Sequence, residues 1–281
     1  MATYTIRTMT RDEVDFAVDM AAREGWNPGL GDAECFYRCD PEGFLVGLLD
    51  NRPIACISAV DYGNGLAFMG FYVVLPEFRG RGYGLSIFHQ ALERLRGRSI
   101  GGDAVDAQLS NYQKIGFVPA YRNSRFEGVS QVAEVRHPAL RPVAGLDFDA
   151  LVAYDAAIFT AQRRKFLECW LRTPRTLGLG WVEGGELRGY GVIRPCGLGW
   201  KIGPLFADRP DVADALFTAL RGHPGPGERL FLDAPLPNAA AVALAGRYAM
   251  RVVFETTRIY LGPTPSIPLA QVFGVTSFEL G

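Results

Sequence analysis

The most informative stretch of the sequence is Phe71-Tyr72-Val73-Val74-Leu75-Pro76-Glu77-Phe78-Arg79-Gly80-Arg81-Gly82-Tyr83-Gly84. Its first residues are aromatic or β-branched, which is typical of a strand, and this apolar run ends at Pro76. The segment after Gly84 places Leu85, Phe88, Leu92 and Leu95 at helical spacing. The predicted order is therefore strand, glycine-rich loop and helix.

A glycine-rich loop at the start of a helix is a favourable place for a phosphate group. The first N–H groups of a helix have no intrahelical partner and carry a partial positive charge. Glycines let this backbone approach a ligand closely, and Arg79 and Arg81 add two full positive charges. We therefore predict a pyrophosphate site here, with a glycine turn that binds no ligand as the plain alternative.

Two other nucleotide loops do not fit this stretch. A Walker loop needs Lys and then Ser or Thr after its last glycine, where this chain has Leu85 and Ser86. A dinucleotide-binding loop needs two residues between its second and third glycines, but only Tyr83 separates Gly82 from Gly84.

The loop does match the Arg/Gln-x-x-Gly-x-Gly/Ala pattern of the GNAT acyl-CoA transferases, at Arg79, Gly82 and Gly84. A second match is Tyr112, followed after three residues by Gly116-Phe117, since GNAT proteins end their last helix in this way. The chain resembles this family over residues 3–128. The resemblance implies an α/β (α+β) fold with a mixed, mostly antiparallel central sheet flanked by helices.

The resemblance also implies roles for individual residues. Acetyl-CoA would be the co-substrate, and Tyr112 would contact it and protonate its leaving thiolate as general acid. The pantetheine arm would lie along the strand that contains Tyr72, Val73 and Val74. The pyrophosphate would be held by the loop residues Arg79, Gly80, Arg81, Gly82, Tyr83 and Gly84.

The general base stays open at this stage. An amine with a solution pKa of about 10 is mostly protonated at neutral pH, so a group must accept its proton. GNAT enzymes often use a Glu on the strand before the loop, but residues 66–74 of this chain contain no acid. Asp32, Glu34 and Asp61 are candidates by topology, and each also suits a surface or capping position.

The acceptor site is predicted in the loop from Trp26 to Asp32, which joins two predicted helices over residues 10–23 and 32–39. GNAT folds build their acceptor pocket in this region, so Trp26, Asn27 and Asp32 are the predicted contacts to a small-molecule amine. Trp26 fits a place in the hydrophobic core equally well.

The second half of the chain weakly repeats the first. The sequence predicts a strand, a helix, a strand, a helix and a strand over residues 200–206, 211–221, 229–232, 239–248 and 251–261. In addition, the segment from Ala245 to Met250 aligns without gaps with that from Tyr112 to Phe117. At the loop position the second copy has Ala207-Asp-Arg-Pro and no glycine, and Ala245 replaces Tyr112. We expect a catalytic domain over residues 1–135, a linker over 136–145 and a degenerate GNAT-like domain over 146–281.

This arrangement, including the final Phe273-Gly-Val-Thr-Ser-Phe-Glu-Leu-Gly, resembles a bacterial group of tandem two-domain GNAT proteins whose substrates are unassigned. In that group a degenerate second domain follows an acetyltransferase. Closing over the acceptor pocket of the first domain is one role open to the second.

Composition excludes several classes of protein. The net charge is −1 with no basic stripe, so we expect no nucleic-acid partner. No apolar run is long enough to span a membrane, and the N-terminal residues do not resemble a signal peptide. Five scattered cysteines suit a reducing cytoplasm, with Cys35 and Cys39 as core thiols and no metal site. The sequence leaves monomer and homodimer open.

The sequence thus predicts an acetyl-CoA-dependent N-acetyltransferase that acts on a primary amine of a small or amino-acid-like molecule. One alternative is a non-catalytic acyl-CoA sensor, which the missing strand carboxylate favours. Another is a GNAT-fold transferase with a different donor, carrying a longer acyl chain or an aminoacyl group.

Overall fold

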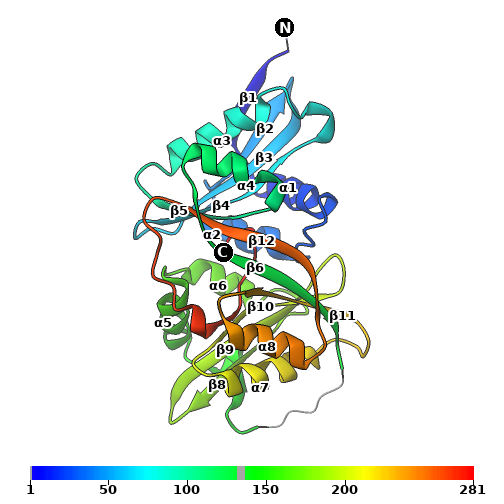
Figure 1. Ribbon diagram of the computed structural model, residues 1–281, viewed down its shortest axis with the longest axis vertical. Coiled ribbons are helices and arrows are strands. Elements are labelled where there is room, and N and C mark those ends of the chain that lie inside the picture. The colour runs from blue at the N-terminus through cyan, green and yellow to red at the C-terminus, as the bar shows by residue number, and fades with distance from the viewer. Residues whose placement is uncertain (1, 132–136) are drawn as a thin grey trace.

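A computed structural model of the chain describes residues 2–131 and 137–281. Thirteen strands within these residues form one sheet, and helices pack against it (Figure 1). The elements of the first half are β1 Tyr4–Thr8, α1 Arg11–Arg23, α2 Asp32–Cys39, β2 Phe44–Leu49, β3 Arg52–Asp61, β4 Leu66–Val74, η1 Pro76–Phe78, α3 Tyr83–Arg94, β5 Ser99–Ala104, α4 Asp106–Ile115 and β6 Val118–Val129.

The second half follows a similar order of strands and helices. Its elements are β7 Leu140–Pro142, η2 Val143–Gly145, α5 Phe148–Phe159, α6 Arg164–Trp170, β8 Leu177–Glu183, β9 Glu186–Pro195, β10 Trp200–Ala207, α7 Pro210–Arg221, β11 Arg229–Pro235, α8 Ala239–Arg247, β12 Arg251–Leu261, η3 Leu269–Gln271 and β13 Val272–Gly274. The predicted linker begins at residue 136, outside the described residues, and residues 140–142 of it pair with β8 as an edge strand. The domain boundary stays a prediction.

Local sequence patterns predicted most helices and strands of the first half correctly. Helix α1 begins with a capping box formed by Thr10 and Glu13, and α2 spans the predicted residues. Leu85 was expected on the buried face of α3 but is 54% exposed, because the helix packs through Ile87, Phe88, Ala91 and Leu95 instead. Strand β5 was not predicted, since its sequence Ser-Ile-Gly-Gly-Asp-Ala has little β-propensity.

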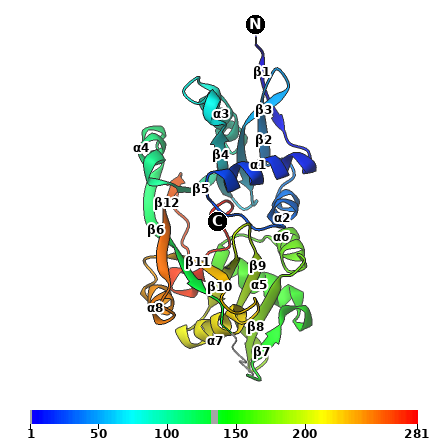
Figure 2. The ribbon, with the colours of Figure 1, turned by 90° about the vertical axis from the view of Figure 1, so that its right-hand side faces the viewer.

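The two halves exchange strands at the centre of the sheet. The strand order is β1-β2-β3-β4-β5-β12-β6-β11-β10-β9-β8-β7, so β12 from the second half lies between β5 and β6 of the first. In return, β6 pairs with β11 of the second half over residues 123–129 and 229–235. Figure 2 shows β6 and β12 running side by side from one half into the other. Neither half therefore has a complete sheet of its own.

The internal duplication is visible in the backbone at the ends of α4 and α8. The N–H of Phe117 bonds the carbonyl of Tyr112, and the N–H of Met250 bonds that of Ala245. The residue before each donor, Gly116 or Ala249, has positive φ, 108° in one case and 51° in the other. The predicted alignment of these two segments therefore holds residue by residue in the fold.

Buried ion pairs and a disulfide connect the halves. Arg194 of β9 pairs with Asp32 at the start of α2, and Arg125 of β6 pairs with Asp233 of β11 through two hydrogen bonds of 2.6 and 2.7 Å. The prediction that Cys35 is a free core thiol is wrong, because α2 packs on α6 and joins Cys35 to Cys169. Cys39, Cys56 and Cys196 are the free cysteines.

The disulfide gives a testable stability effect. It closes a sequence separation of 134 residues, so Cys169→Ser should lower the free energy of unfolding by about 4 to 5 kcal/mol in the chain-entropy picture. Chemical denaturation of both proteins without reductant measures this difference. Thiol titration of the denatured, unreduced wild type should find Cys39, Cys56 and Cys196 reactive. Reaction of all five cysteines would contradict the disulfide.

Candidate active site

The site lies where two neighbouring strands of the first half diverge. Strands β4 and β5 form a parallel pair only between residues 66–69 and 99–102. Beyond this point they separate, and a cleft of about 720 Å³ opens between residues 69–74 on one side and Gly102, Asp103 and α4 on the other. The divergence exposes an edge of β4 that no neighbouring strand covers.

A bulge interrupts β4 where it lines this cleft. Ser58 of β3 is opposite Gly70, while Cys56 is opposite Val73, so β4 carries one extra residue. Phe71 has a φ of 48°, a strained value for a side chain of this size, and its carbonyl accepts a hydrogen bond from the Cys56 thiol at 3.1 Å. The bulge breaks the pairing with β3 and re-aims the backbone next to the cleft.

The glycine loop closes the outer end of the cleft. Gly80 and Gly82 both have positive φ, at 74° and 86°, and apart from each glycine and its chain neighbours no atom of residues 2–131 or 137–281 lies within 4 Å of the place where a Cβ would stand. Among the residues that the structure describes, no side chain caps α3, so the N–H groups of its first turn are free for an anion. A Cβ on Gly84 would lie 2.8 Å from the Tyr72 hydroxyl, so a larger residue here would crowd Tyr72 where α3 approaches β4. These features fit the pyrophosphate of an acyl-CoA.

Of the other predicted cofactor residues, some line the cleft and some do not. Tyr72, Val73, Val74 and Arg79 line the cleft, and the Nε of Arg79 donates to the Val74 carbonyl at 2.8 Å. Arg81 does not line it; its guanidinium lies over the Phe78 ring, 5.7 Å from the centroid. Tyr83 packs on Tyr4 instead, with ring centroids 4.7 Å apart, and offers the site only its backbone.

Tyr112 lines the cleft from α4, opposite β4. Its ring packs against Phe88 and Phe117, with centroids 5.8 and 5.5 Å away. Burial, and next the neighbouring Tyr72, raise the pKa of the Tyr112 phenol well above its usual range. The phenol therefore stays protonated at neutral pH, which is the state that a general acid needs.

The predicted acceptor loop is divided between the cleft and the interface of the two halves. Trp26 lines the cleft, and its carbonyl accepts from Arg125 at 2.6 Å. Asn27 lies away from the cleft and exchanges two hydrogen bonds with the backbone of Leu198. Asp32 is 1% exposed and is held by Arg194 and the Gly29 N–H, so it does not reach the cleft either.

None of the three base candidates from the sequence lines the cleft. Glu34 pairs with Arg11 and Arg38 on the surface, and Asp61 pairs with Arg98. Sequence reasoning missed the wall that the second half supplies, which consists of Phe254, Thr256, Ile259, Phe278 and Glu279. A charged residue inside the apolar Phe-Glu-Leu sequence at 278–280 is a signal that could have identified one of them.

The equivalent place in the second half is filled by the chain itself. Strands β10 and β11 are parallel over residues 200–202 and 230–232 and then diverge, as β4 and β5 do. Strand β13 pairs with β10 beyond this point, and the N–H of Val275 donates to the carbonyl of Asp233 on β11. The helix that follows, α7, begins with Pro210 instead of a glycine loop.

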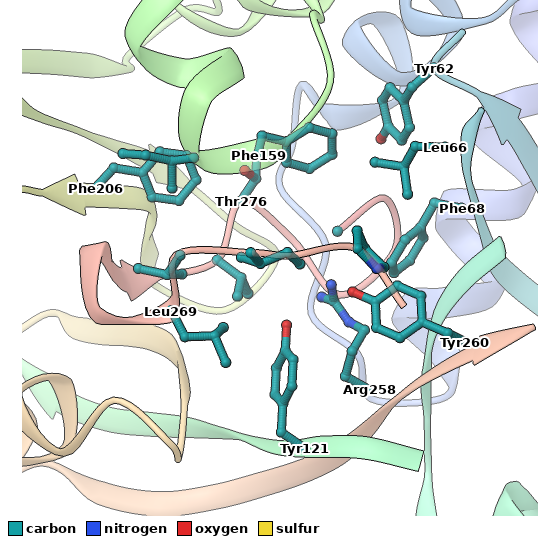
Figure 3. Close-up of a pocket in the computed structure, with 16 residues that line it drawn as sticks. Tyr62, Leu66, Phe68, Tyr121, Phe159, Phe206, Arg258, Tyr260, Leu269 and Thr276 are labelled. Carbon is teal, nitrogen blue, oxygen red and sulfur yellow. The ribbon is translucent and has the colours of Figure 1, made fainter. Parts of the chain in front are cut away.

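A smaller cavity of about 40 Å³ lies on the other side of residues 278–281. Gly281 lines this cavity, whereas Phe278 and Glu279 line the cleft. Figure 3 shows Tyr121, Arg258 and Tyr260 on one side of it and Phe159 and Phe206 of the second half on the other. The final residues of the chain therefore separate two spaces between the halves.

Comparison with known proteins identifies the family. The model described as Acetyltransferase (GNAT) family matches residues 10–118, and the one described as Acetyltransferase (GNAT) domain matches residues 151–274. Holothin acyltransferase from Pseudoalteromonas sp. (strain SANK 73390) is 30% identical over 279 residues, which cover 99% of this chain and 95% of that protein. This chain belongs to the GNAT family.

Solved structures agree with the tandem GNAT fold. A candidate acetyltransferase from Pyrococcus horikoshii is 24% identical with a TM-score of 0.84, over 99% of this chain and 96% of its own. A tandem GNAT protein from the clavulanic acid biosynthesis pathway is 15% identical with a TM-score of 0.64, over 94% of this chain and all of its own. The predicted fold class of two tandem GNAT-like domains is confirmed, and the protein is a GNAT acyltransferase.

Two further properties concern the described residues only. None of their helices is long and apolar enough to cross a membrane. They also contain no group of three or more His, Cys, Asp or Glu side chains placed to hold a metal ion.

Proposed function

We propose that this GNAT protein transfers an acetyl group from acetyl-CoA to the primary amine of a small molecule, and that it does so in the first-half cleft. The observation that carries the proposal is the coincidence, in one cleft, of an uncapped helix start, a bulged and unpaired strand edge and a protonated phenol. Cytoplasmic location and the absence of nucleic-acid and membrane partners remain part of this proposal, although the Cys35–Cys169 disulfide removes the cysteine argument for that location.

Different residues of the cleft would serve different steps of acyl transfer. The N–H groups at the start of α3 would bind the pyrophosphate, and β4 beyond Gly70 would align the pantetheine arm. Acetyl-CoA supplies the activated acyl carbon as a thioester. Tyr112 would donate its phenolic proton to the thiolate as the C–S bond breaks, which makes CoA a better leaving group.

The acceptor is proposed from the relative that spans the whole chain. That protein is named for holothin, so holothin is the first acceptor to test. Trp26 and the second-half residues Phe254 and Phe278 give the cleft an aromatic wall beside the thioester position. Such a wall suits a flat or apolar acceptor more than a strongly charged one.

The test measures release of the CoA thiol from acetyl-CoA with holothin and with a panel of small primary amines. Release that depends on the acceptor, with an acylated product of the correct mass, would support the proposal. Faster release from a longer acyl-CoA would replace the acetyl donor but keep the transferase. No release with any donor and acceptor pair would contradict it.

The second half is proposed to bind no acyl-CoA, since β13 occupies the edge of β10 that a pantetheine arm would need. Calorimetric titration of acetyl-CoA should therefore give one site per chain. Deleting residues would disturb the interface, so the intact chain is used. A stoichiometry of two would mean that the second half also binds the co-substrate.

A further inference from the structure

We propose that Glu279 is the general base that takes the proton from the acceptor amine. This inference rests on the proposed function. It assigns the general base that β4 does not supply, since β4 contains no acidic residue. Glu279 lies in the segment that follows β13, far in sequence from the glycine loop and Tyr112, yet it lines the same cleft.

Elimination among the carboxylates of the cleft leaves only this one. Three acidic residues line it within the described residues. Glu24 binds Arg79, and Asp103 is held by two hydrogen bonds from Arg258. Both side-chain oxygens of Glu279 are buried and have no hydrogen-bond partner in the described structure. A buried carboxyl group without partners is costly for folding, so it is retained where a ligand supplies the partner.

Glu279 is placed beside the bulge of β4. A Cβ on Gly70 would lie 2.1 Å from the Glu279 carbonyl oxygen, so the two backbones are in direct contact. Gly70 immediately precedes Phe71, whose positive φ marks the bulge. The Glu279 backbone therefore touches the turn of β4 along which the thioester would lie.

The segment that carries Glu279 is firmly held. The Ser277 and Gly281 backbones exchange two hydrogen bonds, and the Tyr62 hydroxyl donates to the Leu280 carbonyl at 2.6 Å. The Leu280 N–H donates to the Ser277 hydroxyl at 3.1 Å. Residues 272–281 are all buried. Because the Glu279 side chain is itself buried, packing around it restrains its carboxyl group without a hydrogen bond.

Burial and the surrounding positive charges act on the proton affinity of Glu279 in opposite directions. Burial raises the pKa of Glu279 above the ordinary value for glutamate, while the positive charges of Lys201 and Arg125 act in the opposite direction. A carboxylate with a raised pKa is a stronger base than ordinary glutamate. The charged groups that act on it are Asp32 of α2, Arg125 of β6, Arg194 of β9, Lys201 of β10 and Asp233 of β11.

Glu279 and Tyr112 together account for every proton that moves in the reaction. The Glu279 carboxylate takes one proton from the ammonium form of the acceptor, and the freed nitrogen lone pair attacks the thioester carbon. The C–N bond forms, the C–S bond breaks, and Tyr112 gives its proton to the leaving thiolate. The second proton of the nitrogen returns to the Tyr112 phenolate, and Glu279 releases its proton to solvent.

The test compares two acceptors that differ in their need for a base. Glu279→Gln keeps the shape of the side chain and removes the base. For the amine acceptor found in the assay above, kcat/KM at neutral pH should fall about 100-fold or more, and the acid limb of its pH profile should move up to the pKa of the free amine. Hydroxylamine is largely unprotonated at neutral pH, so its acetylation should change less than fivefold. The Kd for acetyl-CoA should be unchanged.

Matched controls separate catalysis from structure. Glu34→Gln and Asp61→Asn remove carboxylates outside the cleft, so both variants should keep wild-type pH profiles. Because Glu279 is buried without a partner, Glu279→Gln should leave the thermal midpoint unchanged or raise it. A structural role would instead lower the midpoint and reduce activity toward both acceptors equally.

The outcomes distinguish this inference from the proposed function. An active wild type whose Glu279→Gln variant keeps the acid limb at the wild-type pH would overturn the base assignment and leave the transferase standing. An increase in KM alone would likewise overturn it, since it would make Glu279 a binding group for the ammonium. A wild type that acetylates neither amines nor hydroxylamine would overturn the proposed function and the base together.

Discussion

Gly82→Glu should abolish measurable acetyl-CoA binding, because we expect Kd to rise about 100-fold or more. Gly82 is the N-cap of α3 and has a φ of 86°. It therefore lies next to the uncapped N–H groups of the first turn, where we propose that the pyrophosphate binds. A glutamate here would put a negative charge against a phosphate and place a side chain in a left-handed backbone that costs about 1 to 2 kcal/mol. Calorimetry with acetyl-CoA measures the loss of binding.

Two control variants separate charge from strain. Gly97 has a φ of 81° with open space around its Cβ position and lies just beyond the opposite end of α3, so Gly97→Glu has the same strain and charge away from the loop. It should bind acetyl-CoA as the wild type does. Gly82→Ala keeps the strain without the charge and should bind with an intermediate Kd. Unimpaired binding by Gly82→Glu would place the pyrophosphate elsewhere.

Tyr112→Phe should lower kcat about 100-fold while the Kd for acetyl-CoA changes less than twofold. The variant keeps the ring contacts with Phe88 and Phe117 and removes only the proton donor. Since the phenol pKa is raised, the wild type should not lose its general acid as the pH rises to the ordinary tyrosine value of about 10. Steady-state kinetics and a pH profile measure both effects.

Tyr72→Phe is the matched control for the second phenol of the cleft. Burial also raises the pKa of Tyr72, but its hydroxyl lies against the glycine loop near Gly84. We expect a smaller loss of kcat in Tyr72→Phe than in Tyr112→Phe. The reverse order would transfer the general-acid role to Tyr72, and an unchanged kcat in Tyr112→Phe would exclude Tyr112 from the mechanism.

The sequence by itself determined the family and the strand, glycine loop and helix around the proposed pyrophosphate site. A strand, a glycine loop and a helix are adjacent in the chain, so local spacing was enough to predict Gly82 and Gly84 at the start of α3. The match of Tyr112 with Gly116 and Phe117 was equally local, and it also predicted the aligned turn at Ala249. Short-range geometry depends on neighbouring residues, which is why these predictions agree with the structure.

Only the tertiary structure decided which distant residues line the cleft with the loop and Tyr112. Asp32 was a candidate from its loop position, but Arg194, distant in sequence, buries it in an ion pair. Cys35 was expected as a core thiol until α6 brought Cys169 to it. The exchange of β6 and β12, and the approach of Glu279 to the bulge of β4, join residues that no local pattern relates. Such contacts depend on how two halves of the chain pack, and packing between distant segments cannot be read from the spacing of either one.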